Sequence, residues 1–226
     1  MNKTAWVAGA SGLIGRNLIR QLCAHPAYDK VVAFVRQPIT FDINPSSKLE
    51  QWQVEYTHLD TSIAQQNHAE RVDDLFCALG STRKKTPDAE QFYQIDVVYP
   101  EIFAKAGKAR GAKFLGVVSA HGANRQAWSR YFRMKGDMEA HLGALDFERL
   151  CFARPGLLKG DRDEFRLLEK IAEGITNHLP GNYQSIQAED VATALIQQAN
   201  PSSDTLVSQG TLILESRFMQ QANQIS

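Results

Sequence analysis

Two side chains suited to proton transfer, Tyr131 and Lys135, lie four residues apart in the segment YFRMK. In a helix this spacing places both side chains on one face. A tyrosine hydroxyl can give a proton to an oxygen that becomes negatively charged, and it can take the proton back in the reverse direction. A neighbouring ammonium favours the phenolate and lowers a pKa that is ordinarily about 10. The pair therefore points to acid–base chemistry at a carbonyl or alcohol oxygen.

A serine precedes this pair by twelve residues, and Ser119 ends a segment, 112–119, that we predict to be a buried strand. Ligands of parallel sheets bind beyond the carboxyl ends of the strands. Ser119 could therefore orient a substrate oxygen and stabilise the charge that develops on it. The Tyr–Lys spacing alone does not establish a site, because an amphipathic helix with a core tyrosine and a solvated lysine has the same pattern.

Near the start of the chain, three glycines follow one another at intervals of three residues, at Gly9, Gly12 and Gly15. They follow a predicted strand, 4–8, and open a predicted helix, 13–24, which is the setting of a phosphate-binding loop. The first suits a tight turn, the second leaves room for a pyrophosphate, and the third permits close packing of the helix. N–H groups at the helix start then attract the anion, although a plain strand-to-helix turn remains the alternative. The residues expected at the phosphates are Gly9, Ser11, Gly12, Leu13, Ile14 and Gly15.

The residue at the tip of the second predicted strand, 30–36, selects between the two nicotinamide nucleotides. That residue is Arg36 and not an acid. A guanidinium suits the 2′-phosphate of NADP(H), so we expect NADP(H) to be preferred over NAD(H). A solvated surface arginine is the alternative. Asp60 could bond the adenine amino group or cap a helix. Leu79 and Gly80, after the fourth predicted strand, could approach the ribose or simply end the strand.

Predicted strands and helices alternate along the chain, and this rhythm indicates a parallel sheet covered on both faces. Right-handed crossovers then give an α/β fold with a doubly wound, Rossmann-like sheet. We expect one domain over residues 1–226, in which residues 156–226 contribute a small lobe on the substrate side and a polar, partly mobile tail from about Glu215. The predicted strands are 4–8, 30–36, 52–57, 73–79, 112–119, 149–154 and 211–214, and the predicted helices are 13–24, 91–108, 129–144, 163–175 and 189–199.

The ordered set of GASGLIG, Ser119 and YFRMK resembles the short-chain dehydrogenase/reductase superfamily. The strings FCALGSTRKKT, VVSAHGANRQAWSRYFRMKGDMEAHL and FARPGLLKGDR are similar to its atypical, single-domain subgroup, which includes the Tat-interacting-protein-30-like oxidoreductases. The resemblance covers about residues 4–199. It implies a Rossmann-type fold, NADP(H) binding, and Tyr131 as the acid/base with Lys135 as its partner.

The resemblance also implies further cofactor contacts. They would come from Arg36, Leu79, Gly80 and Lys135, and from the loop after the sixth strand, where Pro155, Gly156 and Leu157 would lie near the nicotinamide and Arg162 would reach the phosphates or form a surface ion pair.

The chain departs from the family in two places. Many relatives have a second serine after the first, whereas Ala120 and His121 follow Ser119 here. The active asparagine of some members has no clear counterpart, and Asp96 stands in that region.

Composition bounds the function classes. The 226 residues include 25 basic and 25 acidic side chains, so no net charge attracts the chain to nucleic acid or an acidic membrane. We see no targeting segment and no run long enough to span a bilayer. Cys23, Cys77 and Cys151 lie far apart in apolar contexts, which predicts reduced core thiols and a cytoplasmic protein. The histidines show no ligand spacing, so we expect no metal.

The hypothesis that these residues favour is an NADP(H)-dependent oxidoreductase that reduces a small carbonyl or oxidises an alcohol. A regulatory protein that senses NADP(H) without turnover would use the same pocket, and an isomerase or dehydratase with a retained nucleotide would use the same residues. The intact Tyr131–Lys135 pair favours the enzyme. We expect a small-molecule substrate and no nucleic-acid or membrane partner, and helices 91–108 and 129–144 could pair across the two-fold axis of a homodimer.

Overall fold

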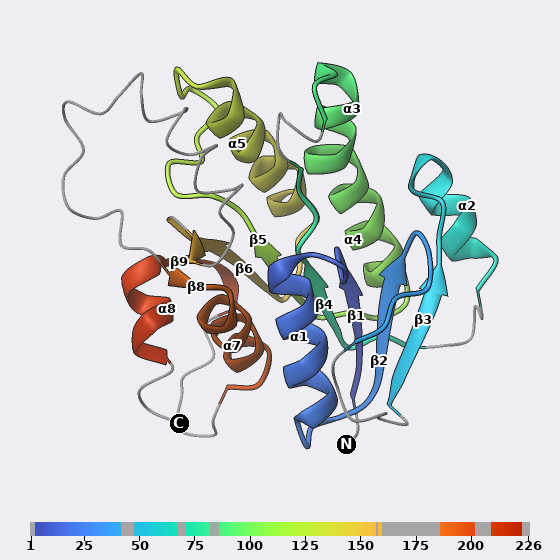
Figure 1. Ribbon diagram of the computed structural model, residues 1–226. Helices are drawn as coiled ribbons and strands as arrows, with labels where there is room; N and C mark the ends of the chain where they lie inside the picture. Colours follow the sequence, from blue (N-terminus) through green and yellow to red (C-terminus); the bar gives the residue numbers. More distant parts are fainter. Residues whose placement is uncertain are drawn as a thin grey trace.

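The computed structural model describes residues 3–41, 48–66, 71–81, 86–156, 158–159, 186–201 and 209–222. Its centre is a seven-stranded sheet in which all strands are parallel, in the order β3-β2-β1-β4-β5-β6-β9 (Figure 1). The strands are β1 (Lys3–Ala8), β2 (Tyr28–Val35), β3 (Leu49–Gln53), β4 (Asp74–Cys77), β5 (Phe114–Val118), β6 (Arg149–Arg154) and β9 (Gly210–Glu215). Two short strands, β7 (Leu158–Lys159) and β8 (Ile186–Gln187), pair separately.

Helices cover both faces of this sheet (Figure 1). On one face lie α1 (Leu13–Ala24), α7 (Ala188–Ala199) and α8 (Ser216–Ala222), and on the other lie α2 (Leu59–Ala64), α3 (Ala89–Tyr93), α4 (Tyr99–Ala109) and α5 (Arg130–Gly143). Each face has its own apolar core, since successive strand residues point to opposite faces. The doubly wound α/β fold that we predicted is therefore confirmed. Its chain order reverses between β1 and β4, the point where such sheets bind ligands.

Local patterns located most elements correctly. The predicted helix 13–24 and strand 149–154 have the predicted bounds. The predicted strand 52–57 is wrong, because β3 ends at Gln53 and a 3₁₀ turn, Tyr56–His58, follows. The predicted helix 91–108 is interrupted by a π-helical turn, Gln94–Val98, between α3 and α4. Pro100 explains the interruption, because it has no N–H to donate to the carbonyl four residues earlier.

Residues 216–222 form a helix that we did not predict. This helix, α8, follows β9 directly, and its residue Met219 is fully buried against the core. We expected residues 156–226 to contribute a small lobe. Within this segment, β9 extends the main sheet and α7 packs on α1. The predicted helix 163–175 lies outside the described residues.

Candidate active site and cofactor site

The predicted acid–base pair lies at the start of α5. Ser129 has an extended backbone, and α5 begins at Arg130, one residue before Tyr131. Lys135 is buried, with 3% of its surface exposed, and Tyr131 is partly buried against the core of the same face. Because α5 follows the carboxyl end of β5, both side chains lie near the ligand-binding edge of the sheet.

A buried ion pair anchors the lysine. Nζ of Lys135 lies 2.9 Å from Oδ1 of Asp96, and both side chains are almost completely buried. Oδ2 of Asp96 accepts a 3.0 Å hydrogen bond from the N–H of Ser81. Burial by itself lowers the pKa of Lys135, but the attraction of Asp96 and Tyr131 outweighs burial and raises this pKa above its ordinary value. The ammonium therefore stays charged at neutral pH.

Asp96 reaches the lysine from the π-helical turn, a feature that is frequent at functional sites. In that turn the N–H of Tyr99 donates to the carbonyl of Gln94, five residues back. The sequence indicated only that Asp96 stood in the right region. Pro100 interrupts the predicted helix, and this interruption is the sequence signal that could have located Asp96 more closely.

Gly80 lies next to this ion pair, beyond the carboxyl end of β4. A Cβ atom at Gly80 would lie 3.5 Å from Oδ1 of Asp96 and 3.8 Å from Nζ of Lys135. Glycine therefore leaves space beside an ammonium whose N–H groups could bond ribose hydroxyls. This arrangement fits the nicotinamide end of a dinucleotide. Leu79, the other residue predicted here, packs against the apolar core of the α4 and α5 face.

Ser119 follows β5 as predicted, but its hydroxyl has a partner that we did not expect. Oγ of Ser119 donates a 2.5 Å hydrogen bond to Oε1 of Glu139, one turn beyond Lys135 on α5. Glu139 in turn accepts two bonds from Arg154, at 2.9 Å from Nε and 2.6 Å from Nη2. A serine hydroxyl has one proton, so Ser119 in this arrangement does not also donate to a substrate oxygen. The substrate-orienting role expected of Ser119 thus conflicts with this geometry.

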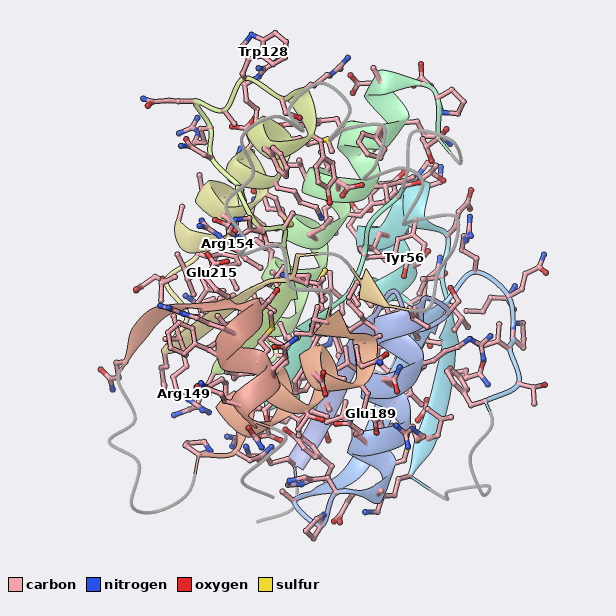
Figure 2. The ribbon with its side chains drawn as sticks, turned by 60° about the vertical axis from the view of Figure 1, so that its left-hand side comes forward. Tyr56, Trp128, Arg149, Arg154, Glu189 and Glu215 are labelled. Carbon is pink, nitrogen blue, oxygen red and sulfur yellow. The ribbon has the colours of Figure 1, made fainter. Side chains whose placement is uncertain are left out.

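Glu139 and Arg154 are residues that sequence reasoning missed. Two signals could have found them: Glu139 continues the four-residue spacing of Tyr131 and Lys135, and Arg154 is the last residue of a predicted strand. Figure 2 shows Arg154 close to Glu215, at the side of the sheet where β6 and β9 end. Glu215 contacts His121 at 2.8 Å, so the loop after β5 is tied to the end of β9.

The glycine loop has the geometry of a strand-to-helix turn that glycine alone permits. Gly9 has a φ of +78°, and a Cβ there would lie 2.4 Å from the carbonyl oxygen of Ala78. A Cβ at Gly15 would lie 2.1 Å from the carbonyl oxygen of Gly9. Both glycines are therefore required by the fold itself.

Gly12 is different, and it tests whether a phosphate group fits. Its φ is −75°, and a Cβ there would meet only the carbonyl oxygen of Gly9, at 3.3 Å. The N-cap residue of α1 is Gly12, which has no side chain to accept a hydrogen bond, and the first turn has no acidic residue. The leading N–H groups of α1, which include those of Leu13 and Ile14, thus have no acceptor from their own cap residue and could bind an anion. Ser11 is exposed beside them. The loop fits a pyrophosphate.

Arg36 is exposed directly after β2, as predicted. Between β2 and the glycine loop lies Tyr56, which sequence reasoning missed because nothing local marks it. Its hydroxyl accepts a hydrogen bond from the N–H of Gly9 and donates a long one, 3.4 Å, to the carbonyl of Phe34. In Figure 2, Tyr56 lies toward the β2 and β3 side of the sheet, away from Arg154. Tyr56 therefore ties the glycine loop to the end of β2.

Asp60 lies in the first turn of α2. There it lines a groove of about 550 Å³ between α2 and α4, together with Ile63 and Lys105. The described contacts do not bring Asp60 to the glycine loop. The alternative that we left open, a helix N-cap, is wrong, because α2 begins at Leu59 with His58 as its N-cap residue. The adenine contact stays a prediction.

The loop after β6 is only partly described. The carbonyl of Pro155 accepts a 3.0 Å bond from the N–H of His121, and the N–H of Gly156 donates a 2.8 Å bond to Oγ of Ser216. Leu157 and Arg162 lie outside the described residues. Within the described ranges, no group of three or more His, Cys, Asp or Glu side chains could hold a metal ion.

A parallel sheet with this strand order, a glycine loop that leaves room for phosphate and a Tyr–Lys pair at the same edge define a nucleotide-binding protein of the Rossmann type. Residues 9–201 match a family described as NAD(P)H-binding, and the chain belongs to that family. Protein HTATIP2 of Rattus norvegicus is 33% identical over 211 residues, which are 93% of this chain and 84% of the relative. The chain is thus a nucleotide-binding protein of the NAD(P)H-binding family, similar to HTATIP2.

Fungal proteins are similar to it as well. The mitochondrial protein FMP52 of Candida albicans is 31% identical over 202 residues, 87% of each chain. Several such relatives are mitochondrial, so our cytoplasmic expectation is contradicted. Buried cysteines show only that thiols are protected, and they do not distinguish one reducing compartment from another. Among the described residues, no helix combines the length and apolarity needed to cross a membrane.

Solved structures share the fold. A short-chain dehydrogenase family protein from Francisella tularensis superposes with a TM-score of 0.71 at 14% identity, covering 98% of this chain and 100% of that chain. MoeE5 in complex with UDP-glucose and NAD gives a TM-score of 0.66 at 16% identity, covering 99% of this chain and 82% of that chain.

Proposed function

We propose that this protein is an NADP(H)-dependent oxidoreductase that acts on a small carbonyl or alcohol, with Tyr131 as the acid/base and Lys135 as its partner. The observation that carries the proposal is the buried Lys135–Asp96 pair, which lies next to Gly80 and one helical turn from Tyr131. A fully buried ammonium is costly, and here it stands one helical turn from a phenol. That arrangement suits acid–base chemistry better than core packing.

In this proposal each side chain has one task. The reduced nicotinamide, when bound, supplies the hydride that carbonyl reduction requires. Tyr131 gives its phenolic proton to the carbonyl oxygen as that oxygen becomes an alkoxide. Lys135 bonds the ribose hydroxyls in the space beside Gly80 and stabilises the tyrosine when it loses its proton.

The preference for NADP(H) rests on Arg36. Its guanidinium is exposed where β2 ends, beside the glycine loop that would hold the pyrophosphate. A 2′-phosphate placed there would gain charge-assisted hydrogen bonds that the ribose hydroxyl of NAD(H) does not form.

The test is a parallel titration of the protein with NADPH and NADH, followed by tryptophan fluorescence. We expect NADPH to bind more tightly than NADH. Arg36→Ala should reduce the ratio of the NADPH affinity to the NADH affinity by about tenfold or more. Arg71→Ala is the matched control, because Arg71 is an exposed arginine before β4, at the opposite edge of the sheet. Equal binding of the two nucleotides by the unaltered protein would refute the NADP(H) assignment.

Turnover is then measured with a panel of small aldehydes and ketones. Wild-type activity that Tyr131→Phe abolishes without weakening NADPH binding would support the oxidoreductase. NADPH binding without turnover of any compound would instead favour the sensing protein, and absence of nucleotide binding would defeat both functions.

A further inference from the structure

The most exposed large apolar side chain among the described residues is Trp128, with 90% of its surface open to solvent. It lies between β5 and α5, one residue before the N-cap of α5. In Figure 2 its ring projects from the end of the molecule, beyond the loop that carries it. The other two tryptophans, Trp6 and Trp52, are buried in the core. An indole ring that is fully solvated here is available to another surface.

The backbone on either side of this tryptophan is held in place. Nη1 of Arg133 donates hydrogen bonds to the carbonyl oxygens of Ala127, at 2.8 Å, and of Trp128, at 2.6 Å. The N–H of Ala127 donates a 2.9 Å bond to the carbonyl of Asn124, and the N–H of Gln126 donates a 2.8 Å bond to the Asn124 side chain. Because Arg133 belongs to α5, the loop is fixed to that helix. Binding through the indole would therefore not have to order the loop first.

The side chains around the tryptophan are basic. Residues 124–133, which we call the Trp128 tip, include three exposed arginines, Arg125, Arg130 and Arg133, and no acidic residue. Asp137, farther along α5, pairs with Arg125 at 3.0 Å. The bonds that Arg133 makes to the tip go to neutral carbonyl groups, so they do not cancel its charge. The tip therefore carries a positive excess beside the exposed ring.

The carboxylates at this end of the molecule gather at another place. Burial raises the pKa of Tyr93 on α3, and Asp137 and Glu101 add to this rise because their negative charges disfavour the phenolate. These acids thus lie close enough to act on Tyr93. Arg130 and Arg133, in contrast, follow the tryptophan closely in the chain.

A positive tip that ends in one aromatic ring fits the surface of an anionic lipid bilayer. Tryptophan is enriched at the headgroup level of bilayers, where its ring contacts apolar chains and its N–H contacts water. Basic side chains at that level are attracted to anionic headgroups. A protein partner would need a broader contact, because one projecting ring lacks the surrounding contacts that exclude water from a hot spot.

We propose that the Trp128 tip binds this protein peripherally to anionic lipid surfaces, with the ring of Trp128 at the headgroup level and Arg130 and Arg133 against the headgroups. The inference does not depend on the proposed function. It departs from our expectation of no membrane partner, which rested on the zero net charge of the whole chain. That sum does not report how the charge is distributed over the surface.

The test compares vesicles of phosphatidylcholine alone with vesicles of equal parts phosphatidylcholine and phosphatidylglycerol. The full chain is mixed with each at low ionic strength, and the bound fraction is measured by sedimentation. We expect binding to the anionic vesicles that is at least about tenfold tighter than to the neutral ones. Added salt should weaken it, because salt screens the charges.

Tryptophan fluorescence gives a second readout that reports the tip itself. Brominated lipids quench a tryptophan that enters the bilayer. Trp6 and Trp52 are buried, so quenching on vesicle binding would come from Trp128.

Two variants test the two parts of the tip. Trp128→Ala should weaken binding to the anionic vesicles by about tenfold or more, because its ring no longer leaves water. Arg130→Gln should weaken it by about fivefold. Phe218→Ala is the matched control, because Phe218 is an exposed aromatic residue that lies under an arginine, Arg217, on α8. It should bind the vesicles like the wild type.

Three results would overturn the inference. One is a wild-type protein that does not bind the anionic vesicles, which would leave a protein partner as the use of the tip. Another is vesicle binding without quenching of the tryptophan. The third is vesicle binding that Trp128→Ala leaves unchanged or weakens no more than Phe218→Ala does. None of these measurements uses a nucleotide, so they are independent of whether NADPH binds.

Discussion

The glycine loop allows a prediction that separates a glycine required by a ligand from one required by the fold. Replacement of Gly12 by alanine adds a methyl group whose carbon lies 3.3 Å from the carbonyl oxygen of Gly9, at a backbone φ of −75° that alanine readily adopts. Relief of this contact needs a shift of a few tenths of an ångström. Alanine lowers the conformational entropy of the unfolded chain, which stabilises the folded protein, whereas alanine is a poorer N-cap residue than glycine, which destabilises it. The free energy of unfolding should therefore change by less than about 1 kcal/mol.

Replacement of Gly15 by alanine should behave in the opposite way. Its added carbon would lie 2.1 Å from the carbonyl oxygen of Gly9 and 2.8 Å from Cα of Ala10. Both neighbours are backbone atoms, so the loop or the whole start of α1 must move. Overpacking of this kind costs about 1–3 kcal/mol, and we expect the upper part of that range.

The assay pairs urea unfolding with NADPH titration. Gly12→Ala should unfold like the wild type and yet bind NADPH at least about tenfold more weakly, because its methyl group occupies the side from which a pyrophosphate would approach. Gly15→Ala should lose both stability and binding. Gly143→Ala is the control, since a Cβ at Gly143 would meet nothing within 4 Å. Wild-type NADPH affinity in Gly12→Ala would refute the reasoning.

Two further predictions concern buried charges. Glu139→Ala should lower the free energy of unfolding by roughly 3 kcal/mol in urea denaturation, because it removes two charge-assisted hydrogen bonds of the mostly buried Arg154 and the acceptor of the Ser119 hydroxyl. Glu148→Ala, which removes an exposed pair with Lys113, should cost less than about 1 kcal/mol. Equal losses would contradict this ranking. Burial raises the pKa of Asp74 in the folded protein despite its ion pair with Lys3, so the folded state binds a proton more readily than the unfolded state does. The stability of the wild type relative to Asp74→Asn should therefore rise as the pH is lowered from 7 through the folded pKa. A relative stability that falls on acidification would show that the sign is wrong.

Part of the site was predictable because its signals are local. The apolar spacing of α1 and the β-branched run of β2 identified their elements without any tertiary information. Because parallel strands must end at one edge, the order of glycine loop, Ser119 and Tyr131 was enough to bring these residues to the same side of a sheet. The location of the protein was not predictable in this way, since no residue pattern that we used reports the compartment.

The sequence by itself thus determined the fold class, the glycine loop and the helix that holds Tyr131 and Lys135, because each depends on spacing within a short stretch of chain. Only the tertiary structure decided which groups meet. It gave Lys135 a carboxylate partner from Asp96, turned the Ser119 hydroxyl toward Glu139, and joined Gly9 to Tyr56. These contacts link residues that are far apart in the sequence and lie on separate elements. Their geometry depends on how helices and strands pack, which no local pattern records.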